Sequence, residues 1–89
     1  MMEKSKVYAP NWMRVLGYIT DDKSIFDLTK EIGTIVYTEV LHSVNRLVLL
    51  GLIKTEKQGR KRIISLTDDG KFLKGWYLKK VKKGLFDGR

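Results

Sequence analysis

Hydrophobic residues recur at helical spacing through much of the chain, and capping or turn-forming residues divide the pattern into segments. Residues 10–20 form the first segment, with Pro10 where the first turn of a helix tolerates a missing N–H. The second segment begins at Ser24, which resembles a capping box with Asp27, and it ends at Gly33. The pattern therefore predicts two short helices in the first third of the chain.

A third, longer helix is predicted over about residues 38–50, followed by Gly51. Thr38 is the predicted N-cap, and Thr34 is the alternative. On a helical projection one side of this segment is apolar and the opposite side is polar enough to meet the edges of bases. The apolar side carries Val40, Val44 and Leu47, and the opposite side carries Thr38, His42, Asn45 and Leu49, flanked by Glu39 and Arg46.

Two strands and a fourth helix are predicted after the third helix. Residues 52–57 alternate between apolar and polar positions, residues 58–61 form a turn, and residues 62–66 return. Thr67 is the predicted N-cap of a helix that runs to about Lys83. The hairpin therefore separates the third helix from the fourth.

Length and element order together predict the fold class. Eighty-nine residues without an internal repeat or a linker predict one domain over residues 1–89, with a core over about 10–67 and a C-terminal helix over about 67–83. The order of elements predicts an α+β fold, a winged helix-turn-helix. It would have a three-helix core, a two-stranded β wing and a C-terminal dimerisation helix.

Two stretches of sequence carry a resemblance to a known group of proteins. TEVLHSVNRLVLLGLI (residues 38–53) and ISLTDDGKFL (residues 64–73) resemble winged-helix transcription regulators of the MarR, ArsR and PadR type. Those proteins share a recognition helix that closes on a Leu-x-x-x-Gly-Leu-Ile-like signature, then a wing, then a helix beginning with Leu-Thr-x-x-Gly. The corresponding residues are Leu47, Gly51, Leu52 and Ile53, then Leu66, Thr67 and Gly70. The resemblance covers roughly residues 10–80 and implies a DNA-binding regulator.

Positive charge is concentrated in the second part of the chain. Residues 1–53 hold six Lys or Arg and six Asp or Glu, whereas residues 54–89 hold 12 and 4, so the net charge of +8 lies entirely in the second part. A polyanionic partner is the natural interpretation. The alternative is a solvated, lysine-rich surface that maintains solubility.

The third helix supplies the candidates for reading DNA bases. In the major groove Asn pairs with adenine and Arg with guanine through two hydrogen bonds, so Asn45 and Arg46 are the main candidates. His42 and Thr38 could bond bases or phosphates.

Two residues of this helix have alternative interpretations. Arg46 could instead form an ion pair with Asp27 or Glu31. Glu39, near the helix start, could stabilise the helix dipole or accept a hydrogen bond from a cytosine amine.

The tip of the predicted wing, residues 58–62, is strongly basic. Gly59 permits a tight turn, and the cations that follow, Arg60, Lys61 and Arg62, could face phosphates or enter a narrow minor groove. Basic residues also protect exposed hairpins from pairing edge to edge, which is the alternative interpretation.

The fourth helix is apolar over more of its circumference than one domain-facing stripe requires. We therefore expect a homodimer built on this helix, with the interface residues Phe72, Leu73, Trp76, Tyr77 and Val81. In the alternative interpretation Trp76 and Tyr77 only complete the core of one chain.

Catalysis, cofactors and metal ions have no support in the sequence. The chain has no cysteine, and His42 is its only histidine, which makes a poor metal site or general base without partners. Residues 1–6 are polar and lead into no long apolar run, so we expect neither a secretory signal nor a membrane helix. The expected location is the cytoplasm, with association to the nucleoid.

These observations predict a homodimeric transcription regulator that binds double-stranded DNA specifically, most simply a repressor. The expected site is an inverted repeat with half-sites about 34 Å apart. The alternatives are an architectural DNA-binding protein that tolerates many sequences and a winged-helix adaptor that binds another protein.

Overall fold

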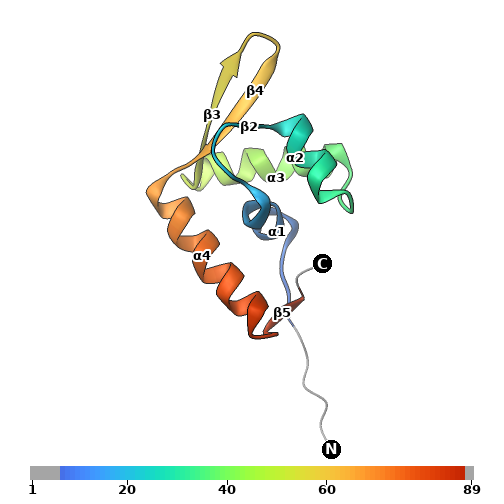
Figure 1. The fold of residues 1–89 in the computed structure, drawn as a ribbon, viewed down its shortest axis with the longest axis vertical. Coiled ribbons are helices and arrows are strands. Elements are labelled where there is room, and N and C mark those ends of the chain that lie inside the picture. Colours follow the sequence, from blue (N-terminus) through green and yellow to red (C-terminus); the bar gives the residue numbers. More distant parts are fainter. Residues whose placement is uncertain (1–6, 88–89) are drawn as a thin grey trace, which may run out of the picture.

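The computed structural model describes the backbone of residues 7–87 and the side chains of residues 8–85; residues 1–6, predicted to carry no secretory signal, lie outside the described residues. The described residues form four helices and five strands, and the strands belong to two small sheets (Figure 1). In chain order they are β1 (Val7–Tyr8), α1 (Asn11–Tyr18), β2 (Lys23–Ser24), α2 (Ile25–Ile32), α3 (Tyr37–Leu49), β3 (Ile53–Gln58), β4 (Lys61–Leu66), α4 (Asp68–Lys82) and β5 (Phe86–Asp87).

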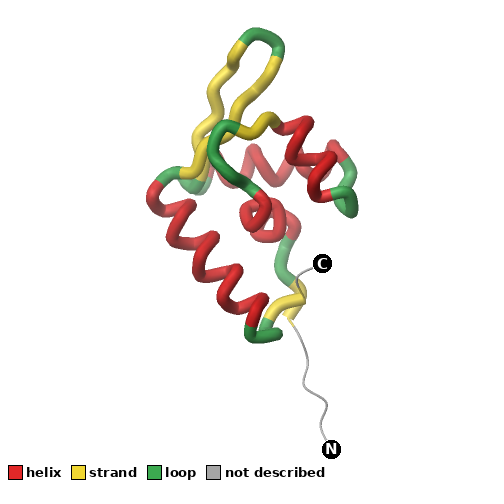
Figure 2. Tube along the Cα trace, in the orientation of Figure 1, coloured by secondary structure: helices red, strands yellow, loops and turns green. Residues whose placement is uncertain are grey.

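The hairpin of β3 and β4 projects away from the helices, as Figure 2 shows. Its antiparallel register runs from the pair Ile53 and Leu66 to the pair Gln58 and Lys61, which leaves a two-residue turn at Gly59 and Arg60. Gly59 has φ +63°, a conformation that glycine adopts without a Cβ clash. The hairpin predicted from the alternating pattern is therefore present, with its turn two residues shorter than expected.

A third strand, β2, joins the base of this hairpin and was not predicted. It pairs antiparallel with β4, so that the order in the sheet is β2-β4-β3. The pairing begins at Asp22, which has φ +65° and donates its N–H to the carbonyl of Ile64 at 3.0 Å. Asp21 also contributes, because its carboxylate accepts the N–H of Leu66 at 3.0 Å. A two-residue strand shows no alternation in sequence, which is why the pattern missed it.

The core lies where α1, α2 and α3 meet the inner face of the sheet. Val15 and Leu16 of α1, Leu28 of α2 and Ile64 of β4 are fully buried there. The apolar side predicted for the third helix is confirmed, since its three residues, Val40, Val44 and Leu47, are also fully buried. The opposite side of α3 is thereby turned outward.

The helix starts agree with the sequence at α2 and differ at α3. The Ser24 hydroxyl accepts the N–H of Asp27 at 3.1 Å, and Gly33 follows α2 with φ +74°, both as predicted. The N-cap of α3 is Val36, without a side-chain cap, so the prediction of Thr38 or Thr34 was wrong. Burial of Ile35 in the core fixes where the chain enters the helix and overrides the preference for a capping hydroxyl.

The start of the first helix also differs from the prediction. Pro10 is the N-cap of α1 rather than its first residue, and its carbonyl accepts the N–H groups of Met13 and Arg14, each at 3.1 Å. The helix ends at Tyr18, two residues earlier than expected. The following turn through Asp22 uses those residues to reach β2.

The start of α4 is bonded to the end of the α3 region through Thr67. Its N–H donates to the Leu52 carbonyl at 3.1 Å, and its hydroxyl donates to the Gly51 carbonyl at 2.7 Å. The same hydroxyl accepts the N–H of Gly70 at 3.1 Å, which confirms Thr67 as the N-cap. The Leu-Thr-x-x-Gly motif thus joins the last helix to the segment that follows α3.

From this joint α4 runs away from the hairpin, along α1, to the opposite end of the molecule (Figure 1). Tyr77 is buried, with 3% of its surface exposed, and a Cβ on Gly17 of α1 would lie 3.0 Å from the Tyr77 ring. Close contact between α1 and α4 therefore depends on a glycine. Beyond α4 the parallel pair of β1 and β5 brings the two ends of the described chain together.

Candidate nucleic-acid interface

The outer side of α3 carries the polar residues predicted to read bases. Thr38, His42 and Asn45 are all exposed, and they follow one another along the helix on the side opposite the core. Leu49 continues the same side near the helix end and is 87% exposed. The structure therefore brings these candidates together on one surface.

Glu39 lies on the flank of α3 that faces α1. Asn11, the first residue of α1, donates from its amide to the Glu39 carboxylate at 3.3 Å, and Arg14 donates to the Asn11 oxygen at 3.4 Å. These contacts give Glu39 a partner within the chain, in addition to its favourable place in the first turn of α3. An open hollow of about 500 Å³ separates this part of α1 from His42 and Arg46 of α3.

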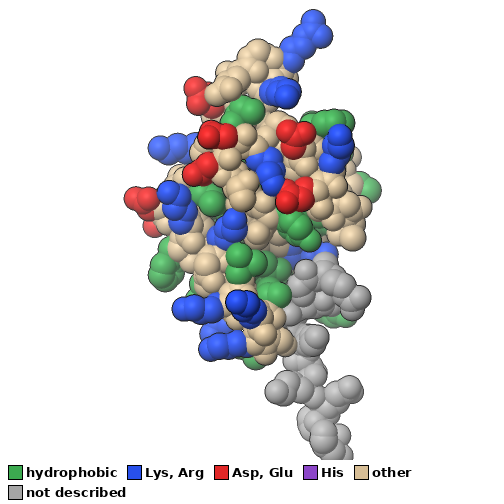
Figure 3. All heavy atoms as spheres, viewed as in Figure 1, with side chains coloured by type: hydrophobic (Ala, Val, Ile, Leu, Met, Phe, Trp, Pro, Cys, Tyr) green, Lys and Arg blue, Asp and Glu red, His purple; other side chains and the backbone are tan. Residues whose placement is uncertain are grey.

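The basic residues of the wing lie together at its tip. Arg60 is in the turn, Lys61 and Arg62 begin β4, and all three side chains are exposed. Figure 3 shows Lys and Arg side chains over the wing and again over the lower end of α4, with most acidic side chains of that face between them. The positive charge of the second part of the chain is thus divided between two ends of the molecule.

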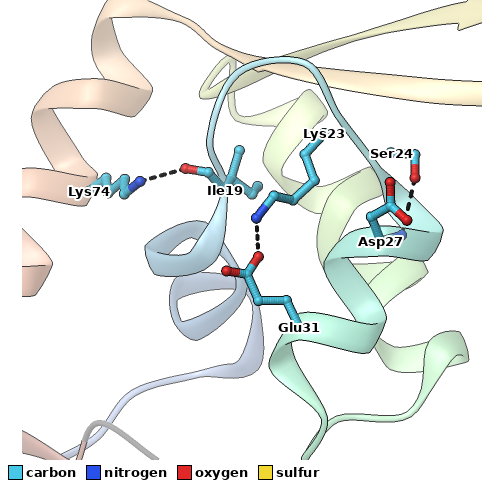
Figure 4. Close-up of polar contacts among 6 residues, drawn as sticks. All are labelled: Ile19, Lys23, Ser24, Asp27, Glu31 and Lys74. Carbon is cyan, nitrogen blue, oxygen red and sulfur yellow. Dashed lines mark hydrogen bonds and ion pairs between the residues drawn. The ribbon is translucent and has the colours of Figure 1, made fainter.

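Arg46 has no acidic partner of the kind that was considered. Among the described residues the one ion pair joins Lys23 to Glu31, and Asp27 lies beside its capping partner Ser24 (Figure 4). Arg46 therefore pairs with neither Asp27 nor Glu31, and its side chain is exposed. It remains available to a partner outside the chain.

One lysine of α4 has a role inside the fold. Lys74 donates from its ammonium group to the carbonyl of Ile19 at 2.5 Å, across the gap between α4 and the end of α1 (Figure 4). Partial burial lowers the pKa of Lys74, and the charge of Lys23 lowers it further. This cation therefore serves the packing of α4 and is separate from the exposed lysines of the helix.

The five residues predicted for a dimer interface occupy different environments. Phe72 is 76% exposed and Trp76 is also exposed, whereas Leu73 and Val81 are half-buried. Tyr77 is buried against α1 of the same chain, in agreement with the alternative that it completes the monomer core. Further exposed apolar side chains that were not in the predicted interface are Tyr18, Leu78 and Leu85.

Two exposed aromatic residues near the wing were not predicted as site residues. Phe26 of α2 is 63% exposed, and Tyr37 at the start of α3 is 49% exposed. For Phe26 the sequence held a signal of exposure, since it lies off the apolar stripe that Ile25, Leu28 and Ile32 form on α2. An aromatic residue outside the core stripe of a short helix calls for an explanation.

No family model matches this chain, and no curated protein matches it significantly. Solved structures do match. F-93 of SSV1 superposes with a TM-score of 0.76 at 18% identity, covering 90% of this chain and 94% of that one. A MarR-family transcriptional regulator from Rhodococcus sp. RHA1 gives 0.72 at 17%, covering 82% and 54%. FabT of Streptococcus pneumoniae, solved in complex with DNA, gives 0.71 at 20%, covering 84% and 55%.

The fold is a winged helix-turn-helix. In this fold α2 and α3 form the helix-turn-helix pair, and the hairpin of β3 and β4 is the wing. The predicted α+β winged helix-turn-helix is confirmed, with β2 as an additional strand at the base of the wing. The dimerisation role of the C-terminal helix stays a prediction. Two of the solved structures that share the fold, the MarR-family protein from Rhodococcus and MepR of Staphylococcus aureus, are described as transcription regulators.

The described part of the chain holds neither a metal-binding cluster nor a membrane-spanning helix. No group of three or more His, Cys, Asp or Glu side chains there could hold a metal ion. No helix of residues 7–87 is both long enough and apolar enough to span a bilayer.

Proposed function

We propose that this protein is a sequence-specific regulator of transcription that binds double-stranded DNA as a homodimer and represses by occupying its operator. In this proposal α3 enters the major groove and the wing, residues 58–62, contacts the backbone or the adjoining minor groove. Thr38, Glu39, His42, Asn45 and Arg46 of α3 and Arg60, Lys61 and Arg62 of the wing form the proposed DNA-binding surface. The protein would act in the cytoplasm, on the nucleoid.

One observation carries the proposal: α3 has an exposed polar face, and the flank of the same helix that holds Tyr37 and Leu41 lines a pocket with the exposed cations of the wing. A B-form major groove admits one α-helix, and the polar residues along α3 are types that can bond to base edges. The cations of the wing match the phosphate backbone. The DNA complex of FabT, which shares the fold, supports the same kind of partner for this chain.

The test is a comparison of two duplexes by fluorescence anisotropy. One duplex is enriched by selection with the purified protein, and the other has the same bases in scrambled order. At about 200 mM salt we expect the selected duplex to bind on the order of 10³-fold more tightly. Equal, steeply salt-dependent binding to both would contradict sequence-specific regulation.

Substitution of the base-reading candidates gives a sharper result. Asn45→Ala and Arg46→Ala should each cost about 1–3 kcal/mol of binding free energy at the selected duplex and little at the scrambled one. The reason is that base contacts confer specificity, whereas phosphate contacts act on every sequence. Equal losses on both duplexes would mean that these residues contact the phosphate backbone of the DNA and read no base.

A homodimer would bring two copies of α3 to one face of the DNA, and the site would then be an inverted repeat. The exposed apolar residues of α4, above all Phe72 and Leu78, support this arrangement. Light scattering at micromolar concentration should give twice the 10.3 kDa mass of one chain. Phe72→Asp combined with Leu78→Asp should give the single mass, while a wild-type monomer would rule the dimer out.

A sequence-tolerant architectural role is the second candidate, and the charge distribution favours it. Residues 54–89 carry the whole net charge, whereas α3 contributes Arg46 as its one Lys or Arg. An interface dominated by the wing would bind most duplexes alike. The two-duplex comparison distinguishes this role from the first.

A further inference from the structure

An open pocket of about 510 Å³ lies between the wing tip and the first turns of α2 and α3. One side is built from apolar and aromatic residues of the helices, namely Phe26, Tyr37 and Leu41. The other side is built from the wing cations Arg60, Lys61 and Arg62. An apolar wall therefore faces a cationic wall across a space open to solvent.

The aromatic wall is turned toward this space and not toward the core. About half or more of the surfaces of Phe26 and Tyr37 are exposed, and Leu41 beside them is half-buried. Lys30 places its ammonium group 5.3 Å from the centre of the Phe26 ring, which adds a further cation at the helix side. A ligand in the pocket would meet apolar surface and positive charge together.

The proposed docking of the protein determines which part of DNA reaches this pocket. If α3 lies in the major groove and the wing in the adjoining minor groove, the strand that separates the two grooves must pass between α3 and the wing. A strand of DNA presents apolar deoxyribose and anionic phosphate in alternation. The apolar wall of the pocket matches the deoxyribose, and the cationic wall matches the phosphate.

We propose that this pocket seats one sugar–phosphate strand of the bound duplex, with deoxyribose against Phe26, Tyr37 and Leu41 and phosphate against Arg60, Lys61 and Arg62. The inference rests on the proposed function. It assigns to the helix wall a contact with DNA that reads no base and acts on every sequence.

One lining residue opposes the occupant. Asp27, in the first turn of α2, is the acidic side chain among the lining residues, and it is exposed. A carboxylate beside a phosphate is repulsive. Asp27→Asn removes that repulsion while keeping the size of the side chain, and it should therefore bind every duplex more tightly, about 3-fold at low salt.

The first test measures Tyr37→Ala on the selected and the scrambled duplex over a range of salt concentrations. Loss of the ring should weaken binding about 10-fold on both duplexes, because buried apolar surface is lost without regard to sequence. The slope of log K against log salt should stay unchanged, since the variant removes no cation. Tyr8→Ala is the matched control, because Tyr8 is 80% exposed on β1, and β1 pairs with β5 at the end of the molecule opposite the wing (Figure 1).

The possible outcomes distinguish a failure of this inference from a failure of the proposed function on which it rests. If the wild-type protein binds no duplex at low salt, both the inference and the proposed function are wrong. A wild-type protein that binds while Tyr37→Ala binds equally well ends the inference alone, and so does a loss confined to the selected duplex, which would make Tyr37 a base reader. The gain in affinity from Asp27→Asn keeps the test valid if Tyr37→Ala folds poorly, because a folding defect cannot tighten binding.

Discussion

Gly70→Ala should destabilise the fold severely. A Cβ built on Gly70 would lie 1.8 Å from the carbonyl oxygen of Leu52, far inside van der Waals contact. That carbonyl cannot simply move away, because it accepts the N–H of Thr67 at the N-cap of α4. Ala at this position therefore has to separate the start of α4 from the segment after α3.

The expected cost is about 3 kcal/mol of unfolding free energy or more, at the upper end of what overpacking does. A chain of this size is stable by about 4–13 kcal/mol in total. Thermal unfolding followed by circular dichroism should show a Tm about 12 °C or more below the wild-type value.

Gly75→Ala provides a matched control for this prediction. Gly75 lies in the same helix and is exposed, and a Cβ there would meet no atom within 4 Å. Because Ala has a higher helix propensity than Gly, this variant should gain about 0.5–1 kcal/mol of unfolding free energy. If both substitutions lowered the Tm alike, a cause common to the two, such as disturbed assembly on α4, would be responsible and the contact with Leu52 would not.

The sequence predicted most of this fold because its local signals agree with the packing. Ser24, Gly33 and Thr67 act as caps where the pattern placed them, and the inner stripe of α3 is buried. The local signal failed at the start of α3, where burial of Ile35 decides the entry into the helix. It also failed for β2, whose two residues depend on pairing with β4 across a long separation in sequence.

The candidate site was predictable in part for the same reason. Exposure of Thr38, His42 and Asn45 follows from helical periodicity once the inner stripe is known. The pocket at the wing does not follow from periodicity, because Phe26 and Arg60 meet there only through the tertiary fold. Whether these residues touch DNA stays a prediction.

Removal of the wing cations should have the largest effect on DNA binding. The triple variant Arg60→Ala, Lys61→Ala, Arg62→Ala should reduce the magnitude of the slope of log K against log salt by about 2.7 for each protomer, at about 0.9 for each phosphate that the protein no longer neutralises. At about 50 mM salt this corresponds to a loss of affinity on the order of 10³-fold. Anisotropy titrations at four or more salt concentrations measure both quantities.

The other end of the molecule supplies a control with the same change in net charge. Lys79, Lys82 and Lys83 are exposed near the end of α4, which lies opposite the wing in Figure 1. Their triple substitution by Ala should leave the slope unchanged, because screening removes most of the effect of charges more than about 10 Å from the DNA. Equal changes of slope in both triple variants would mean that the net charge of +8 acts as a diffuse field and that the wing touches no phosphate of its own.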